Sequence, residues 1–160
     1  MIGGSKVTSR DNTARFYTEK KMAFMGGKIV SAVAGQYPQV QLWNPADSGV
    51  LLYMTDMSHL TIGTNERVFE MLSYATALGS DGTESNKYIG EAGPVGQVKW
   101  TTNVARLGTV INEWYYNTYK YNFRIDDPYI IIPEEMGVNI AMVVTNQPLS
   151  ITFEWIEVPI

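Results

Sequence analysis

The sequence contains no cysteine, and only one of its 160 residues is a histidine. Without cysteine the chain cannot form a disulfide, a thiolate metal site or a cysteine nucleophile. The single histidine, His59, excludes any site that needs two imidazoles from one chain. Chemistry that depends on these side chains is therefore excluded before any motif is considered.

Long apolar runs are also missing. No stretch of about 18 apolar residues is present, so the sequence predicts no membrane-spanning helix. The first residues, MIGGSKVTSRDNTARFY, lack the apolar core of a secretory signal peptide. We therefore expect the chain to act, or to be assembled, in a cytoplasm.

Charge is unevenly distributed, although the net charge is only −4. Residues 1–28 carry six Lys and Arg against two acids, whereas residues 125–160 carry six acids and no Lys or Arg. A basic leading segment on an acidic body favours assembly, because the segment of one copy can lie against an acidic neighbour. Two solvated ends are the simpler alternative. The thin spread of positive charge and the acidic total argue against nucleic-acid binding.

What the chain does have is a series of short apolar stretches separated by turns. It contains ten Tyr, four Trp and five Phe, punctuated by 14 Gly and 7 Pro. About eight to ten strands at spacings of about eight to twelve residues predict an all-β fold, a single antiparallel β-sandwich or jelly roll. We expect residues 1–27 to form an extended N-terminal arm, which Gly26-Gly27 separates from a β-sandwich domain over residues 28–160.

The first strong strand signals surround a turn. Residues 37–43 alternate between apolar and polar, so Gln39 and Gln41 are predicted to face away from the core. The turn at residues 44–49 is followed by a second strand over residues 50–57. These two strands are expected to form either a hairpin or a connection between two sheets.

Four further segments are assigned from periodicity and turn residues. Residues 66–78 fit a helix or a strand, and the β-rich context favours a strand. Residues 78–96 hold five Gly and one Pro, and are predicted to be a long loop. Strands over residues 138–145 and 150–158 flank Asn146-Gln147-Pro148 and are predicted to pair as a hairpin. In the last strand one face is expected to be mostly buried.

The turn Asp47-Ser48-Gly49 raises the question of serine chemistry. A nucleophile elbow needs Gly-x-Ser-x-Gly between a strand and a helix, but Ala46 occupies the position of the first glycine and a strand follows. About ten residues of extended chain would place His59 about 30 Å from Ser48. We therefore predict a turn and not a catalytic site, and no enzyme activity for the chain.

Two pairs of acids are candidate metal ligands. Asp126-Asp127 and Glu134-Glu135 could line a calcium site, because hard cations bind clustered carboxylates. Ordinary polar turns explain the same residues, and the spacing of a calcium loop is absent. We therefore predict no metal and no cofactor.

Aromatic residues offer a possible ligand platform. Within the aromatic-rich segment 107–121, Tyr115 and Tyr119 could stack on sugar rings or bases. Packing inside a β-rich fold is the simpler explanation of the same pattern.

Two segments carry a resemblance to a known class of proteins. Residues 42–58 read LWNPADSGVLLYMTDMS, and residues 133–159 read PEEMGVNIAMVVTNQPLSITFEWIEVP. The pair resembles small β-sandwich virion proteins of tailed bacteriophages. Members of that class tend to show an (L/W)-N-P-x-x-S-G turn before a strand, and often end in a strand of the type (I/V)-T-F-E-W. The two segments cover roughly a quarter of the chain.

The resemblance implies a jelly-roll-like subunit, often a homotrimer, that binds the major capsid protein or other virion proteins. The expected role is a capsid decoration (cement) protein that stabilises the phage head. The alternatives are a tail, collar or head-fibre component, or a carbohydrate- or receptor-binding module. The resemblance implies no catalytic residue, and a place in the virion after assembly in the host cytoplasm. From the charge distribution and the lack of long apolar runs we predict no specific nucleic acid and no membrane partner.

The basic arm is the expected partner-binding segment. Its candidate contact residues are Arg10, Arg15, Lys20 and Lys21. On this interpretation, a chain without residues 1–25 folds as a β domain but no longer attaches to its partner.

Overall fold

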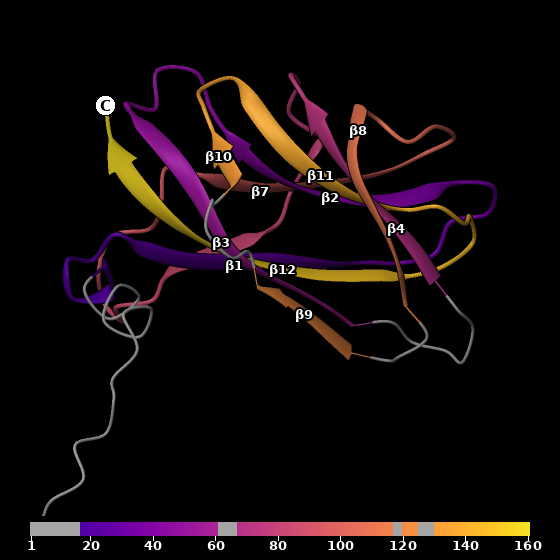
Figure 1. Ribbon diagram of the computed structural model, residues 1–160, viewed down its shortest axis with the longest axis horizontal. Helices are drawn as coiled ribbons and strands as arrows, with labels where there is room; N and C mark the ends of the chain where they lie inside the picture. Colours follow the sequence, from indigo (N-terminus) through magenta and orange to yellow (C-terminus); the bar gives the residue numbers. More distant parts are fainter. Residues whose placement is uncertain (1–16, 61–66, 117–119, 125–129) are drawn as a thin grey trace, which may run out of the picture.

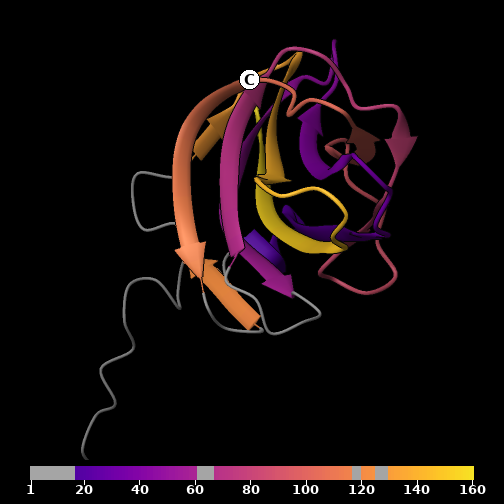
Figure 2. The same cartoon turned by 90° about the vertical axis from the view of Figure 1, so that its right-hand side faces the viewer.

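A computed structural model describes residues 17–60, 67–116, 120–124 and 130–160; of these, the side chains of residues 60, 67–68, 114–116 and 120–124 are not described. The described residues form two six-stranded antiparallel sheets that pack against each other (Figures 1 and 2). The predicted all-β sandwich is therefore confirmed.

Sheet A contains six strands. Its order is β10 (Ile130–Ile132), β3 (Val50–Leu60), β12 (Leu149–Pro159), β1 (Ala23–Val30) and β6 (Thr83–Asn86), and β9 (Lys120–Arg124) also pairs with β3. The long strand β3 therefore has β10 beside its first half and β9 beside its second half.

Sheet B also contains six strands. Its order is β5 (Ser80–Asp81), β7 (Gln97–Asn103), β2 (Tyr37–Asn44), β11 (Met136–Met142), β4 (Arg67–Tyr74) and β8 (Thr109–Tyr116). The preference for a strand over residues 66–78 is confirmed by β4. The segment 78–96, predicted to be a loop, contains β5 and β6, so that prediction was wrong in part.

The core lies between the two sheets and follows from side-chain alternation. On β12, Ile151, Phe153 and Trp155 are at most 1% exposed, which confirms the predicted buried face. The pairing of β12 with β3 shifts register between Glu154 and Trp155. Beyond that irregularity Ile156 is buried as well, so both faces of the strand end are covered.

Successive strands often belong to different sheets. Strand β2 lies in sheet B and β3 in sheet A, so the turn at residues 44–49 connects the two sheets. Strands β11 and β12 also lie in different sheets, so the hairpin predicted around Asn146-Gln147-Pro148 was wrong. The apolar faces of β11 and β12 both point into the shared core. The two strands therefore face each other across the core and do not pair within one sheet.

Strand β1 corrects the predicted arm boundary. It begins at Ala23 and lies between β12 and β6, so residues 23–27 belong to sheet A. Phe24 is only 5% exposed and packs in the core. Removal of residues 1–25 would delete this side chain, and we now expect that truncation to destabilise the fold instead of leaving it intact.

The Gly26-Gly27 pair is part of this strand and does not interrupt it. A Cβ atom at Gly26 would lie 2.6 Å from the carbonyl oxygen of Thr83, and one at Gly27 would overlap the carbonyl oxygen of Ile151. Both neighbours are backbone atoms that a side chain cannot push aside without moving a strand. Glycine is therefore required here by the close approach of β6 and β12.

Gly27→Ala is expected to lower the free energy of unfolding by about 1–3 kcal/mol, because the added methyl group overpacks against β12. Gly79→Ala is the matched control, since a Cβ there meets nothing within 4 Å. It should leave stability unchanged or raise it by up to about 1 kcal/mol. Urea denaturation of both variants measures the difference, and equal stabilities would show that β1 does not pack as described.

Polar side chains on the outer face of sheet B are buried by loops. Gln39 and Gln41 point away from the core as predicted, yet both are 0% exposed. The loops at residues 75–79 and 104–108 cover them and bond to their amides. The bonds are Gln39 Nε2 to Ala105 O at 2.9 Å, Leu107 N to Gln39 Oε1 at 2.8 Å, Gln41 Nε2 to Thr76 O at 3.0 Å and Leu78 N to Gln41 Oε1 at 2.9 Å.

Two further interactions hold the loop at residues 104–108. Asn139 Nδ2 donates to Leu107 O at 2.7 Å, and Arg106 Nη1 donates to the buried carboxylate of Glu70 at 2.7 Å. The outer face of sheet B is thus closed over part of its width by the chain's own loops.

Candidate functional site

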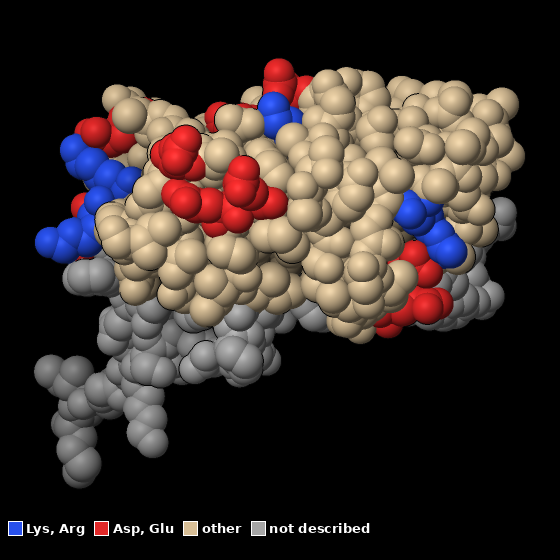
Figure 3. Space-filling model, turned by 90° about the horizontal axis from the view of Figure 1, so that it is seen from above, with Lys and Arg blue, Asp and Glu red and all other residues tan. Residues whose placement is uncertain are grey.

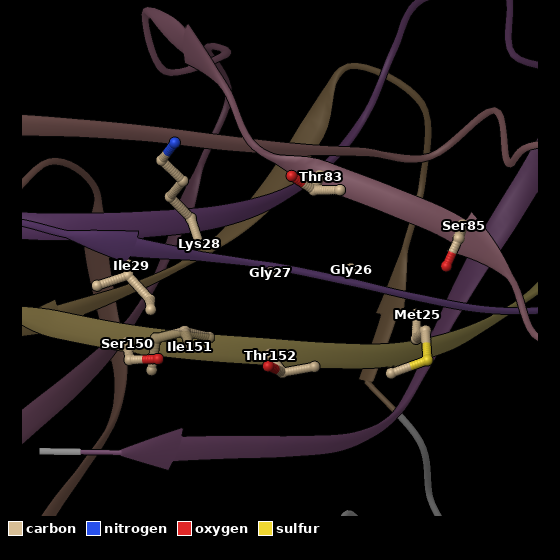
Figure 4. A pocket seen from close by; sticks show the side chains of 10 residues that line it. All are labelled: Met25, Gly26, Gly27, Lys28, Ile29, Thr83, Ser85, Ser150, Ile151 and Thr152. Carbon is tan, nitrogen blue, oxygen red and sulfur yellow. The ribbon is translucent and has the colours of Figure 1, made fainter.

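The outer face of sheet A carries an open furrow of about 560 Å³. It runs over β6, β1 and β12 (Figure 4). Strand register explains why these strands form a hollow. Gly27 pairs with Thr83 on one side and with Thr152 on the other, so the row across the sheet is low at its centre.

Hydroxyl groups flank the furrow on both sides. Figure 4 shows two hydroxyl side chains on β6 and two on β12, with the glycines of β1 between them. A hydroxyl both donates and accepts hydrogen bonds, so these walls can bind peptide or other polar groups without a fixed polarity. The four residues are Thr83, Ser85, Ser150 and Thr152.

Apolar side chains stand at the two ends of the furrow. Met25 is 39% exposed and Ile29 is 66% exposed, and both project from β1 on either side of Gly27 (Figure 4). Lys28 also lies along the furrow, but its side chain alternates to the opposite side of β1, where its Nζ atom lies 5.1 Å from the centre of the Trp100 ring of sheet B. The furrow can therefore hold a partner by apolar packing and hydrogen bonds.

Ser48 has a structural role in the turn at residues 44–49. Its Oγ atom donates to Glu134 Oε1 at 3.2 Å, and the same carboxylate oxygen accepts from Gly49 N at 2.7 Å. Asn44 Nδ2 donates to Val50 O at 2.8 Å. Glu134, which lies in the segment before β11, therefore holds this turn through its hydrogen bonds to Ser48 and Gly49.

His59 lies far from this turn, near the opposite end of β3. Ser48 precedes β3, whereas His59 is its penultimate residue and is 2% exposed. The imidazole lies in the core, with its ring centre 4.4 Å from that of Phe69. Burial lowers the pKa of His59 to about 4, so the ring is neutral at pH 7.

Of the predicted arm contacts, the structure describes two. Lys20 is exposed, and Lys21 follows a short helical turn over residues 17–19. The Lys21 ammonium pairs with the carboxylate of Glu91, which raises the pKa of Lys21, and lies 5.4 Å from the centre of the Tyr88 ring. Lys21 is thus engaged with its own chain. Arg10 and Arg15 lie outside the described residues.

The predicted aromatic platform cannot be placed. The backbone of Tyr115 lies in β8, but its side chain and the whole of Tyr119 are outside the described residues. Asp126 and Asp127 are outside them as well. In the described ranges, no group of three or more His, Cys, Asp or Glu could hold a metal ion.

The sequence alone does not predict the furrow. Its one local signal is the Gly26-Gly27 pair, because glycine inside a strand marks a close backbone approach. The prediction that this pair is a break in the chain is wrong, because both glycines lie inside β1. The hydroxyl walls come from strands that lie far apart in sequence, so no local pattern could reveal them.

A buried carboxylate fixes the loop between β6 and β7. Glu157 is 7% exposed and accepts hydrogen bonds from Gly96 N at 2.7 Å and Val95 N at 3.2 Å. The indole Nε1 of Trp155 donates to the same group at 3.2 Å. Three donors from two segments therefore converge on one side chain.

Glu157→Ala is expected to lower the free energy of unfolding by about 1–3 kcal/mol, because it leaves buried donors without their acceptor. Amide exchange at Val95 and Gly96 should become faster. Glu113→Ala, at an exposed glutamate on β8, is the control and should change stability by about 0.5 kcal/mol or less. Hydrogen exchange that is unchanged at the two amides would contradict the anchoring role of Glu157.

Comparison with known proteins gives no relative: no protein-family model matches the chain, and neither does any curated protein or solved structure. Within the described ranges, no helix has the length and apolar character needed to cross a membrane.

Proposed function

We propose that this chain is a structural, non-catalytic subunit of a bacteriophage virion, and that it acts as a capsid decoration protein. The observation that carries the proposal is the open furrow on sheet A. It exposes apolar groups next to hydrogen-bonding groups on a rigid surface, as protein-binding surfaces do.

The strands that carry the furrow are packed firmly against the rest of the protein. Strands β1 and β12 lie inside sheet A, and the inner side of β12 packs in the core through Phe153 and Trp155. A surface on such a support loses little conformational freedom when a partner binds, which favours affinity.

A low content of charged residues also supports binding to other proteins. Charged residues make up 18% of the chain, below the typical value of about 25%. On the face shown in Figure 3, Lys, Arg, Asp and Glu form a few separate groups, and wide areas between them are uncharged.

The phage assignment rests on the resemblance of residues 42–58 and 133–159 to virion proteins. In this fold, the two segments lie together: Glu134 binds the turn at residues 44–49, and β12 pairs with β3. The two segments therefore form part of the framework of the sandwich. A decoration protein needs only modest affinity at each site, because many copies on a shell multiply the total attachment.

Quantitative mass spectrometry of gradient-purified phage particles tests the proposal. The chain should co-purify with the particles in an amount comparable to that of other structural proteins, and should follow heads when heads and tails are separated. A phage protein of replication serves as the control for contamination. Particles that carry no more of this chain than of the control would rule the proposal out, and enrichment with tails would replace decoration by a tail role.

A further inference from the structure

Two loops close the outer face of sheet B, and they form a natural comparison. The loop at residues 75–79 bonds to Gln41 of β2, and the strap, residues 104–108, bonds to Gln39 of the same strand. In each case the glutamine donates to one peptide carbonyl and accepts from one peptide N–H. The remaining contacts of each loop therefore decide how firmly it is held.

Burial distinguishes the two loops. In the loop at residues 75–79, Leu78 is only 5% exposed, so an apolar side chain anchors that loop. None of the five strap residues is buried, and Val104 is 75% exposed. The strap therefore lacks a buried apolar anchor and depends on polar contacts.

The strap also contacts two strands beyond β2. Asn139 of β11 donates to Leu107 O, and Arg106 pairs with Glu70 of β4. The guanidinium carbon of Arg106 lies 5.5 Å from the centre of the Tyr37 ring. The Arg106 side chain is 32% exposed, so solvent reaches the ion pair from the arginine side and weakens it.

Two buried oxygen atoms next to these contacts favour opening of the strap. Glu70 Oε2 and Asn139 Oδ1 are shielded from solvent and have no hydrogen-bond partner in the described part of the chain. Each belongs to a side chain whose other polar atom bonds to the strap. A buried acceptor without a donor costs free energy, which hydration recovers when the strap opens. Gln41, under the other loop, has both amide atoms bonded.

Gly108 provides a hinge at one end of the strap. It has a φ of 118° and directly precedes β8. Hinges are commonly a few residues at the ends of elements, which absorb changes in φ and ψ. At the other end, Asn103 closes β7, and its Oδ1 atom accepts from Ala105 N at 3.1 Å. The strap therefore joins two strands through short ends and can move without displacing either strand.

We propose that residues 104–108 open and close as a unit over the outer face of sheet B, with the Arg106–Glu70 ion pair as the latch, while the other loop stays closed. The closed strap hides a row of register partners on three neighbouring strands, Gln39, Ala141 and Glu70. Sheet B can therefore offer this row to other molecules only when the strap is open. The inference concerns sheet B and does not depend on the virion role or on the furrow.

Native-state hydrogen exchange followed by NMR is the first test. Leu107 N donates to Gln39 Oε1 and Leu78 N donates to Gln41 Oε1, so the two amides are bonded alike. After correction for intrinsic rates, Leu107 should exchange about tenfold faster or more. Low concentrations of urea should leave the Leu107 rate nearly unchanged, because a local opening exposes little surface. Equal protection of the two amides would overturn the inference.

The latch is tested by Arg106→Gln, which removes the ion pair under the strap. Exchange at Leu107 should become about fivefold faster or more, and exchange at Leu78 should not change. Lys87→Gln is the matched control, because it removes an ion pair with β12 of sheet A and should change neither amide. An Arg106→Gln variant that changes both amides by the same factor, or neither, would contradict a latch.

Thiol labelling gives a second, independent measurement, because the chain has no cysteine. Ala141→Cys places a thiol on the outer face of β11, between Gln39 and Glu70, to which the strap bonds. Ile140→Cys places one on the inner face of the same strand, in the core. Both positions are 0% exposed, so neither thiol can react unless the protein opens.

In the native protein, the thiol of Ala141→Cys should react with an alkylating reagent about tenfold faster or more than that of Ile140→Cys. Urea denaturation of both variants corrects the comparison for any difference in global stability. Equal corrected rates would mean that position 141 is reached only by global unfolding, and the strap would then not open by itself.

Discussion

Replacing Phe153 by alanine is expected to lower the free energy of unfolding by about 3–5 kcal/mol. Phe153 is 0% exposed and lies on β12 of sheet A. Its side chain belongs to the cluster that also contains Leu42, Phe69 and Ile140 of sheet B. Truncation would remove apolar contacts to both sheets and leave a cavity that the surrounding strands fill only in part.

Urea denaturation monitored by tryptophan fluorescence measures this loss. Ile131→Ala on β10 of the same sheet is the control, because Ile131 is 50% exposed and should lose about 1 kcal/mol or less. Similar losses for the two variants would mean that the inner and outer faces of sheet A are not as described.

Acidification from about pH 6.5 to about pH 4 is expected to destabilise the wild type by about 3 kcal/mol more than a His59→Leu variant. Burial lowers the pKa of His59 from its ordinary value of 6.5 to about 4. Below pH 6.5 the unfolded chain therefore binds a proton that the folded chain does not bind. The contribution of neutral His59 is complete above pH 6.5, is lost progressively as the pH falls, and levels off below about pH 4.

Unfolding free energies at a series of pH values check this prediction. Other groups titrate in the same range, among them Glu84, whose pKa is raised mainly by burial. These groups are present in both proteins, so their effects cancel in the difference between the two curves. Parallel curves for the wild type and His59→Leu would show that His59 takes up its proton in the folded state without penalty.

Much of the strand content followed from local patterns. Alternation on residues 151–155 identified the buried face of β12, and the β-rich context decided correctly for a strand at residues 66–78. Pro45 has a fixed φ and Gly49 tolerates a positive φ, so these two residues favour the turn before β3, and Gly49 has a positive φ of 68°. These signals depend only on side-chain period and backbone preference, which a single sequence contains.

Strand pairing could not be predicted from these local patterns, because a short turn can connect two strands in either of two ways. The six residues between β11 and β12 can join paired neighbours or strands that face each other across the core. The burial of Gln39 and Gln41 was also unpredictable, since the loops that cover them come from other parts of the chain.

The furrow depends on the same long-range information. Its residues come from three segments, at positions 25–29, 83–85 and 150–152, which only the completed sheet brings together. The Gly26-Gly27 pair could be interpreted as a flexible break or as a close strand contact, and its neighbours on β6 and β12 decide between them.

The central claim is that this chain is a structural subunit that contacts other virion proteins through sheet A. An electron cryomicroscopy map of purified phage particles, at a resolution that traces side chains, tests it most directly. We predict density for a sandwich of two six-stranded sheets at symmetry-related sites of the head, with the furrow over β6, β1 and β12 filled by protein from a neighbour. A map in which every head and tail protein is traced and no such sandwich is present, or in which its furrow faces solvent, would contradict the claim.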